Sequence, residues 1–451
     1  MAPSVAIPSS FSSSSSSSQL LFCLWILLFA VSFSSPARAA VPASAQFKYV
    51  NSGDFGDYIV EYDGNYRVLD PFNSPFQLCF YNTTPNAFTL ALRMGLVRSE
   101  SLFRWVWEAN RGNPVGENAT LTLGADGNLV LADADGRIAW QTNTANKGVV
   151  GFKLLSDGNM VLHDTKGSFV WQSFDSPTDT LLVGQSLKAG GAAAKLVSRA
   201  SAEVNSNGAY SFVLEPKGLS LYYTGKNYKK PLLYYTTSEW FTVGSGQSLS
   251  NTTLGSSPNP DQGLATDITL SVFSGGSIIL TRPKYNATLS FLRLGIDGNL
   301  RVYTYNDLVD YGAWEVTFTL FDRESIWETE CQLPSRCGDF GLCDDNQCVA
   351  CPLASGLMGW SKACAPAKVT SCKPEDFGFY KVEGVDHFLS KHTRGSSVKE
   401  GECGAKCSKD CKCLGYFYNE DTSRCWIAYE LNTLIKVANS THVGYIKVPK
   451  K

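Results

Sequence analysis

Asp-Gly-Asn turns recur in the chain and are the residues that could bind a ligand. They begin at Asp63, Asp126, Asp157 and Asp297, and a strand-like apolar run follows each of them. Residues two apart on a strand share a face, so an Asp, an Asn and, in the two central copies, a Val place hydrogen-bonding groups beside an apolar surface. This chemistry suits a sugar, which offers hydroxyl groups on a carbon ring. The same residues also make a tight turn between strands, whether or not a ligand binds.

The two central turns belong to an internal repeat. Residues 121–142 align without a gap with residues 152–173, thirty-one positions later, and a fainter third copy ends at Trp107. Each copy predicts a turn, a strand, a second turn and a strand that ends in Trp. One such sheet cannot bury its own apolar face, but three sheets around a shared axis can. We therefore expect the Trp residues to meet in the middle.

The repeat resembles the plant bulb-type, mannose-binding lectin domain, which implies a β-prism of three sheets. The runs 105–114 and 171–182 resemble signatures of the S-domain relatives of these lectins. The chain after its N-terminal segment is similar to the secreted, epidermis-specific type of lectin glycoprotein of plants. That family is related to receptor-kinase ectodomains and lacks the kinase.

The sugar pocket of bulb-type lectins follows the pattern Gln-x-Asp-x-Asn-x-Val-x-Tyr, and every copy here is incomplete. The first and last positions are Gly124 and Ala132 in one copy, and Leu155 and His163 in the next. Losing one buried hydrogen-bonding partner costs about 1 to 3 kcal/mol, so the resemblance implies weak or altered binding of mannose-type sugars.

The copy at Asp297 retains the final Tyr but has Gly295 at its first position and Arg301 in place of Val. His163 could donate to a hydroxyl in place of Tyr, which makes the second copy the least altered. The candidate sugar-binding residues are Asp126, Asn128, Val130, Asp157, Asn159, Val161, His163, Asp297, Asn299 and Tyr303.

The order of motifs predicts a mainly β protein. A bulb-type β-prism is expected over 46–185, with a linker or long loop around 190–194. A second, diverged lectin-like β domain follows over 196–326, with Trp314 at the position of the repeat's Trp. Two small disulfide-rich modules then resemble an EGF-like module, over 331–365, and a PAN/apple domain of mixed α and β structure, over 370–448.

Twelve of the fourteen cysteines lie in the last quarter of the chain, which favours disulfides in an exported protein. Spacing alone leaves the pairings open. The EGF-like resemblance implies the pairs Cys331–Cys343, Cys337–Cys348 and Cys351–Cys364. The PAN-like module should form bridges among Cys372, Cys403, Cys407, Cys411, Cys413 and Cys425.

Three of the PAN cysteines are spaced by four, at Cys403, Cys407 and Cys411, which predicts one helix face joined to strands. A zinc site at Cys348-x-x-Cys351 lacks a second pair of ligands, so we expect no metal. The remaining mature cysteine, Cys79, is either a buried free thiol or one half of an intermolecular bridge.

The N-terminal residues 1–39 are expected to be a signal peptide, because an apolar block precedes the small-x-small sequence that ends at Ala39. No membrane anchor is expected, and the protein should be secreted to the cell wall or apoplast. A formal net charge of -2 gives no reason to expect nucleic acid as a partner. N-glycosylation sequons occur at Asn82, Asn118, Asn251, Asn286 and Asn439.

The sequence carries no catalytic motif, so neither an enzyme nor a cofactor is expected. Two functions remain open. The first is a lectin-like glycoprotein that binds glycans weakly. The second is a protein-interaction or structural wall glycoprotein that binds extracellular glycoproteins through its EGF-like and PAN modules. The PAN resemblance also implies a homodimer.

Overall fold

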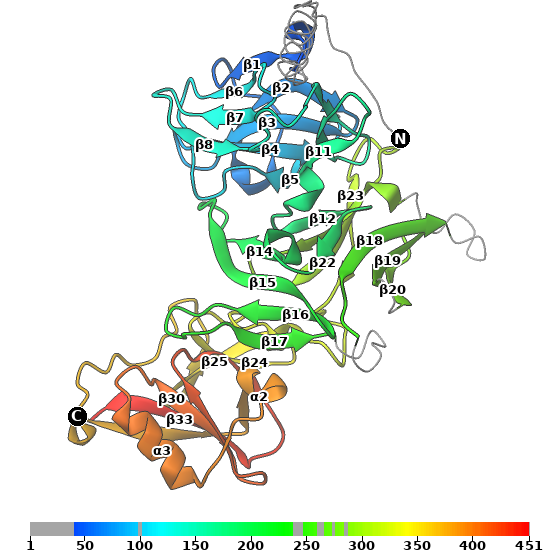
Figure 1. Cartoon of the computed structure of the whole chain (residues 1–451). Helices are drawn as coiled ribbons and strands as arrows, with labels where there is room; N and C mark the ends of the chain where they lie inside the picture. The colour runs from blue at the N-terminus through cyan, green and yellow to red at the C-terminus, as the bar shows by residue number, and fades with distance from the viewer. Residues whose placement is uncertain are drawn as a thin grey trace, which may run out of the picture.

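Three β-rich units follow one another along the chain and are stacked in space (Figure 1). The computed structural model describes residues 40–97, 102–237, 247–258, 266–272, 276–283 and 287–450; the expected signal peptide lies outside these ranges. The mainly β class is confirmed, because strands dominate all three units. The structure also has short 3-10 helices, η1 (Ala43–Ala45), η2 (Glu61–Asp63), η3 (Ser173–Asp175), η4 (Ala192–Ala194), η6 (Ala287–Leu289), η7 (Glu330–Gln332) and η8 (Pro374–Asp376).

The first unit, here called the first prism, has three antiparallel sheets ordered β2-β3-β4-β5, β1-β6-β7-β8 and β11-β10-β9. Its strands are β1 (Phe47–Val50), β2 (Asn65–Asn73), β3 (Phe76–Asn82), β4 (Thr89–Met94), β5 (Arg104–Glu108), β6 (Thr120–Leu123), β7 (Leu129–Ala132), β8 (Ile138–Gln141), β9 (Gly151–Leu154), β10 (Met160–His163) and β11 (Phe169–Gln172). Alternation along β6 buries Leu121 and Leu123, while its threonines face outward.

Trp107, Trp140 and Trp171 meet on the axis of the first prism, one from each sheet. Their ring centroids lie 5.7 to 6.2 Å apart, and the rings pack edge to face. This is the geometry that aromatic pairs prefer. The meeting of the tryptophans expected from the repeat is therefore confirmed.

The second unit, the second prism, has three antiparallel sheets of four strands, ordered β14-β15-β16-β17, β13-β18-β19-β20 and β12-β21-β22-β23. Its strands are β12 (Thr180–Leu182), β13 (Ser186–Lys188), β14 (Lys195–Arg199), β15 (Asn207–Glu215), β16 (Gly218–Tyr223), β17 (Leu232–Thr236), β18 (Asn251–Pro258), β19 (Thr266–Val272), β20 (Gly276–Thr281), β21 (Ser290–Leu294), β22 (Leu300–Tyr305) and β23 (Trp314–Thr319).

The boundary between the prisms differs from the expected one at 185 to 196. β12 pairs with β21 and β13 pairs with β18, so the chain enters the second prism at Thr180. The glycine-rich stretch around Gly190 lies between β13 and β14, inside the second prism, and is not a linker between domains. These strands have three residues each and pair with strands far along the chain, so no local pattern marks them.

Trp314 does not take the place of the repeat's Trp. In the first prism Leu131 pairs with Trp140 and Leu162 with Trp171, whereas the corresponding Val302 pairs with Phe318. Trp314 instead packs on Tyr305. Its indole N–H also donates to the carbonyl of Leu102 at 2.7 Å, which joins the two prisms.

The third unit carries the disulfides. Its elements are β24 (Phe340–Asp344), β25 (Gln347–Leu353), β26 (Gly356–Gly359), β27 (Phe377–Glu383), β28 (Val385–His387), α2 (Phe388–His392), β29 (Ser396–Ser397), α3 (Glu400–Lys409), β30 (Gly415–Asn419), β31 (Arg424–Ala428), β32 (Asn432–Lys436) and β33 (His442–Pro449). The two modules expected over 331–365 and 370–448 are not separate, because β24 pairs in parallel with β32 in a sheet ordered β26-β25-β24-β32-β28.

Six disulfides hold the third unit together. Over residues 331–365, where the resemblance to an EGF-like module was noted, the pairs are those that this resemblance implies, Cys331–Cys343, Cys337–Cys348 and Cys351–Cys364. In the PAN-like part they are Cys372–Cys411, Cys403–Cys425 and Cys407–Cys413. The expected common helix face is wrong for Cys411, because α3 ends at Lys409. Cys403 does join the helix to a strand, β31.

Candidate functional site

The Asp side chains of the three candidate sites hold their own turns. In each, the carboxylate Oδ1 accepts the backbone N–H two residues on, at 3.1 Å for Asp126, 2.9 Å for Asp157 and 3.1 Å for Asp297. The intervening glycine has a φ near +80° in every copy, for example +80° at Gly127, a conformation that other residues rarely adopt. The Asp-Gly-Asn pattern is thus explained by the turn alone.

The Asn side chain of the first site is hydrogen-bonded to the end of β8 and to the loop after it. Asn128 is 8% exposed, and its Nδ2 donates to Gln141 Oε1 at 2.8 Å. Its Oδ1 accepts the N–H of Thr144 and the hydroxyl of Thr142, both at 3.1 Å. Both acceptor positions of the amide oxygen are therefore used within the protein.

The Asn side chains of the other two sites are also hydrogen-bonded within the protein. Asn159 is 4% exposed, and its Nδ2 donates to Gln172 Oε1 at 2.9 Å. Asn299 is fully buried and bonds with both polar atoms to the backbone of Phe321, at 2.9 and 3.0 Å. A sugar would have to compete with these internal bonds for the same atoms.

The apolar positions of the sites also differ from a sugar-binding surface. Val130 is half-buried, but Val161 is 0% exposed and offers no surface to a sugar ring. In the third site Arg301 forms an ion pair with Asp297 at 2.6 Å, which occupies the carboxylate. Tyr303 stacks on Phe291, with ring centroids 5.2 Å apart, in the packing between the prisms.

His163 lies in a different place from the rest of its motif. It lines a cleft of about 460 Å³ at the free edge of β9, where the rings of Phe47, Tyr49 and Phe152 also lie. Its Nδ1 is 3.1 Å from the carbonyl of Asp164. The motif predicts a shared site for His163 and Asp157, but of these two residues only His163 lines the aromatic cleft.

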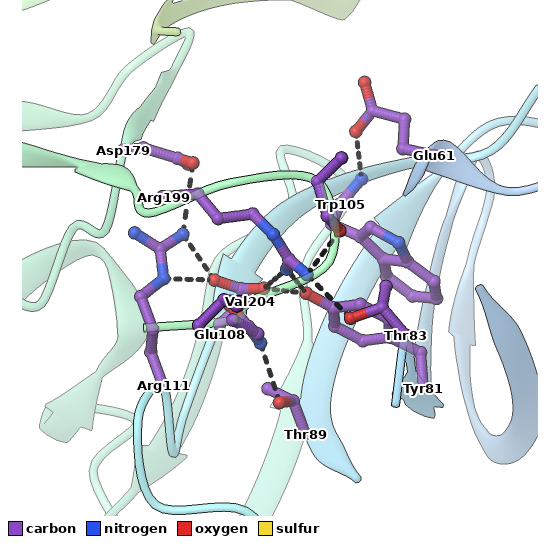
Figure 2. A network of polar contacts seen from close by, with 12 residues as sticks. Glu61, Tyr81, Thr83, Thr89, Trp105, Glu108, Arg111, Asp179, Arg199 and Val204 are labelled. Carbon is purple, nitrogen blue, oxygen red and sulfur yellow. Dashed lines mark hydrogen bonds and ion pairs between the residues drawn. The ribbon is translucent and has the colours of Figure 1, made fainter. Parts of the chain in front are cut away.

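A buried network of charges joins the prisms, and sequence reasoning missed it (Figure 2). The Glu108 carboxylate accepts the hydroxyl of Tyr81 and pairs with Arg111 and Arg199. Arg111 reaches Asp179 at 3.1 Å, across the start of the second prism. Glu108, Asp179 and Arg199 are 6%, 5% and 1% exposed. The network therefore lies out of water, where partners must balance each charge.

A second cluster continues this network through Glu61. Its carboxylate pairs with Arg104 of β5 and, at 2.7 Å, with Arg293 of β21 in the second prism. Burial alone would raise the pKa of Asp179, but the charges of Arg111 and Arg293 outweigh it and hold this pKa below the usual value. The one signal in the sequence was the presence of Glu108, Arg111 and Asp179 in the two signature runs.

Comparison with known proteins identifies the family of the chain. A family model described as D-mannose binding lectin matches residues 104–200, and one described as PAN-like domain matches residues 372–431. EP1-like glycoprotein 3 of Arabidopsis thaliana is 52% identical over 436 residues, which are 95% of this chain and 97% of that protein. The chain belongs to the EP1-like glycoprotein family.

Other relatives agree with this assignment. The epidermis-specific secreted glycoprotein EP1 of Daucus carota is 60% identical over 378 residues, 80% of this chain and 97% of that protein. A receptor protein kinase of Zea mays, ZmPK1, is 30% identical over 399 residues, 85% of this chain but 46% of the kinase. Among the described helices of this EP1-like chain, none has the length and apolar character needed to span a membrane.

The sequons of this EP1-like chain differ in exposure. Asn118 and Asn439 are exposed and Asn251 is half-buried, while Asn286 lies outside the described residues. Asn82 is 4% exposed at the end of β3, and its Oδ1 faces the side-chain amide of Asn65 at 3.4 Å. A glycan on Asn82 would have no path to solvent.

We expect glycopeptide mass spectrometry of the secreted protein to find glycans at Asn118 and Asn439 and none at Asn82. The reason is that a glycan on a buried amide would prevent β3 from packing, so a chain carrying one would not fold for export. Replacing Asn118 by Gln provides the control, because it should remove one glycan and leave secretion unchanged. A folded, secreted protein with an occupied Asn82 would contradict this prediction.

One group of described cysteines lies close enough together to hold a metal ion, but its sulfurs are used in disulfides. Cys337, Cys343 and Cys348 lie close enough together to hold an ion, and in the described part of the chain they are the only such group. Each of these sulfurs, however, is in a disulfide. Cys79 is a free thiol with 0% exposure, and burial raises its pKa to about 12. In the folded chain it is out of reach of an intermolecular bridge.

Proposed function

We propose that this EP1-like chain is a secreted glycoprotein of the cell wall or apoplast that acts by binding other extracellular proteins. In this proposal its lectin folds serve as a rigid support and do not bind mannose. The observation that carries the proposal is the internal use of the Asn side chains in all three candidate sites. Mannose binding requires those atoms to be available to a ligand, and here they are hydrogen-bonded to the neighbouring strand or loop.

The buried network supports the same function. A carbohydrate site within one prism does not depend on the position of the other prism. A docking surface formed by both prisms requires the two to be held in one arrangement. Buried ion pairs across the junction hold the two prisms in place. They join Arg111 to Glu108 and Asp179, and Glu61 to Arg293. The third unit adds a disulfide-linked block, and its PAN-like resemblance implies a homodimer, which a sizing column would test.

A glycan array with the deglycosylated, secreted protein tests the proposal. We expect no binding to mannose-type glycans, because the first site retains only the turn, Asp126 and the half-buried Val130. Deglycosylation matters because the protein's own glycans could occupy its sites. Binding that is lost in Asp126→Ala or in Asp157→Ala with Asn159→Ala would overturn the proposal.

A repaired variant tests whether the two missing positions or the internally bonded Asn128 prevent mannose binding. Gly124→Gln with Ala132→Tyr restores both missing positions of the first site, and a Cβ at Gly124 would meet nothing closer than Asp126 Oδ1 at 3.5 Å. The third site cannot be repaired in this way, because a Cβ at Gly295 would lie 2.4 Å from Asp297 Oδ1. Because Asn128 keeps its bonds to Gln141, Thr142 and Thr144 in this variant, we expect no mannose binding here either, whereas binding gained by the repair would contradict the role given to Asn128.

A further inference from the structure

In the described part of the chain, one sheet of the first prism has one strand fewer than its counterparts. Among the described strands, five of the six prism sheets contain four strands, and the sheet β11-β10-β9 contains three. The vacant position is next to β9. In the second prism β12 fills the corresponding position beside β21, and in the first prism β1 fills it beside β6.

The missing strand leaves apolar side chains partly uncovered. Leu121 of β6 faces Tyr49 of β1 and is 0% exposed, and Leu292 of β21 faces Leu181 of β12 and is 1% exposed. The repeat places Phe152 of β9 at the same position, and its side chain is only half-buried. The fourth strand therefore completes the burial of this position wherever it is present.

The backbone of β9 is also open on this side. In an antiparallel sheet, alternate residues direct their N–H and C=O groups to opposite neighbours. In the second prism the N–H of Leu294 donates to the carbonyl of Asp179, just before β12, at 2.8 Å. Leu154 is the equivalent of Leu294, so its N–H and the polar groups of Phe152 face the vacant position. The carbonyl of Leu154 accepts from Asn73 Nδ2 at 3.0 Å.

A cleft of about 460 Å³ lies along this edge. The rings of Phe47 and Phe152 form part of it, with centroids 5.8 Å apart. Phe72, on its lining, is 53% exposed. A cleft with an aromatic lining beside unpaired backbone groups matches the way in which sheets bind extended peptides: backbone hydrogen bonds give affinity, and a pocket takes alternate side chains.

We propose that the β9 edge of the first prism binds an extended segment of another protein as an added β-strand, with an apolar side chain seated in the cleft opposite Phe152. The proposal names one surface for the protein binding proposed above and rests on that function. β12 shows the chemistry of the occupant, because Thr180–Leu182 fills the equivalent place with Leu181 inward. A sugar would leave the row of backbone groups without partners, whereas a strand satisfies them.

The test uses a fluorescent synthetic peptide with the sequence of residues 177–183, Pro-Thr-Asp-Thr-Leu-Leu-Val, added to the full-length secreted protein. We expect saturable binding with a dissociation constant below about 1 mM, which corresponds to a weak but specific contact. Hydrogen exchange should slow at the amides of Phe152 and Leu154. Methylation of the peptide nitrogen of the Leu that corresponds to Leu181 should weaken binding by at least about tenfold, because it removes one strand hydrogen bond.

Two matched variants on β2 test whether the peptide binds in the cleft. Phe72→Ser should weaken peptide binding about fivefold, because part of the apolar lining is lost. Val68→Ser changes a side chain on the same strand that is 54% exposed and does not line the cleft, so peptide affinity should not change. Both positions are exposed, so neither change should unfold the prism.

Three results would overturn the strand-addition site. The first is no binding of the peptide at about 1 mM, and the second is equal binding of the methylated peptide, which would remove the role of the backbone. The third is concentration-dependent protection of Phe152 and Leu154 without peptide, which would assign the edge to a second copy of the chain. Mannose binding on the array would overturn the proposed function and leave these peptide measurements interpretable by themselves.

Discussion

Replacing Glu108 by Gln is expected to lower the free energy of unfolding by roughly 3 to 5 kcal/mol, the usual cost of breaking a buried ion pair from one side. The change keeps the size of the side chain but removes the charge that faces Arg111 and Arg199. Both guanidinium groups would remain out of water with less compensation. Urea unfolding of the secreted variant, followed by tryptophan fluorescence, measures the loss.

Asp175→Asn is the matched control for this prediction. It makes the same chemical change in the pair formed by Lys188 and Asp175, whose side chains are 51% and 47% exposed. Exposed pairs contribute about 0 to 1 kcal/mol, because water screens them. Equal losses in the two variants would show that the network has no special role in holding the prisms together.

The position of Glu108 explains why this effect should be large. Tyr81 donates to the same carboxylate, and burial together with Glu108 raises the pKa of Tyr81 well above its usual value, so its hydroxyl keeps the proton. Arg199 also donates to the Tyr81 oxygen at 2.5 Å. The loss of one charge therefore disturbs several hydrogen bonds that polarise one another.

The first prism could be predicted from the sequence because its information is local. The thirty-one-residue repeat fixes the turn, the strand and the Trp within one copy, and that was enough to place Trp140 against Trp171. The boundary between the prisms could not be predicted in this way. β12 pairs with β21 more than a hundred residues later, and a three-residue strand carries no periodicity of its own.

The candidate sites show a different limit. The sequence pattern is consistent with two roles for Asn159, as a sugar ligand or as part of a turn, and both use the same residue types at the same spacing. The hydrogen-bond partner of the side chain decides between these roles. For Asn159 this partner is Gln172, which lies on another strand. The charged network was hidden for a related reason: Glu108 and Arg111 resemble surface residues until the fold brings Asp179 beside them.

The third unit should lose most stability when the disulfide between Cys403 and Cys425 is removed. These residues are 22 positions apart, and the chain-entropy relation gives about 3 kcal/mol for such a loop. Both sulfurs are also buried, with 0% and 2% exposure, in the contact between α3 and β31. Each missing buried atom adds about 1 kcal/mol for the cavity that it leaves. Cys403→Ala with Cys425→Ala should therefore cost about 5 kcal/mol.

Cys372→Ala with Cys411→Ala separates the two contributions. This disulfide closes a longer loop, 39 residues, so entropy alone gives about 4 kcal/mol, but both cysteines are exposed and their removal leaves no cavity. The measurement is hydrogen exchange of the α3 amides in the full-length protein at increasing urea. Faster exchange in the Cys403 and Cys425 variant is the expected order, because packing in the small core adds to loop closure. The reverse order would mean that the length of the closed loop alone determines what each bridge contributes.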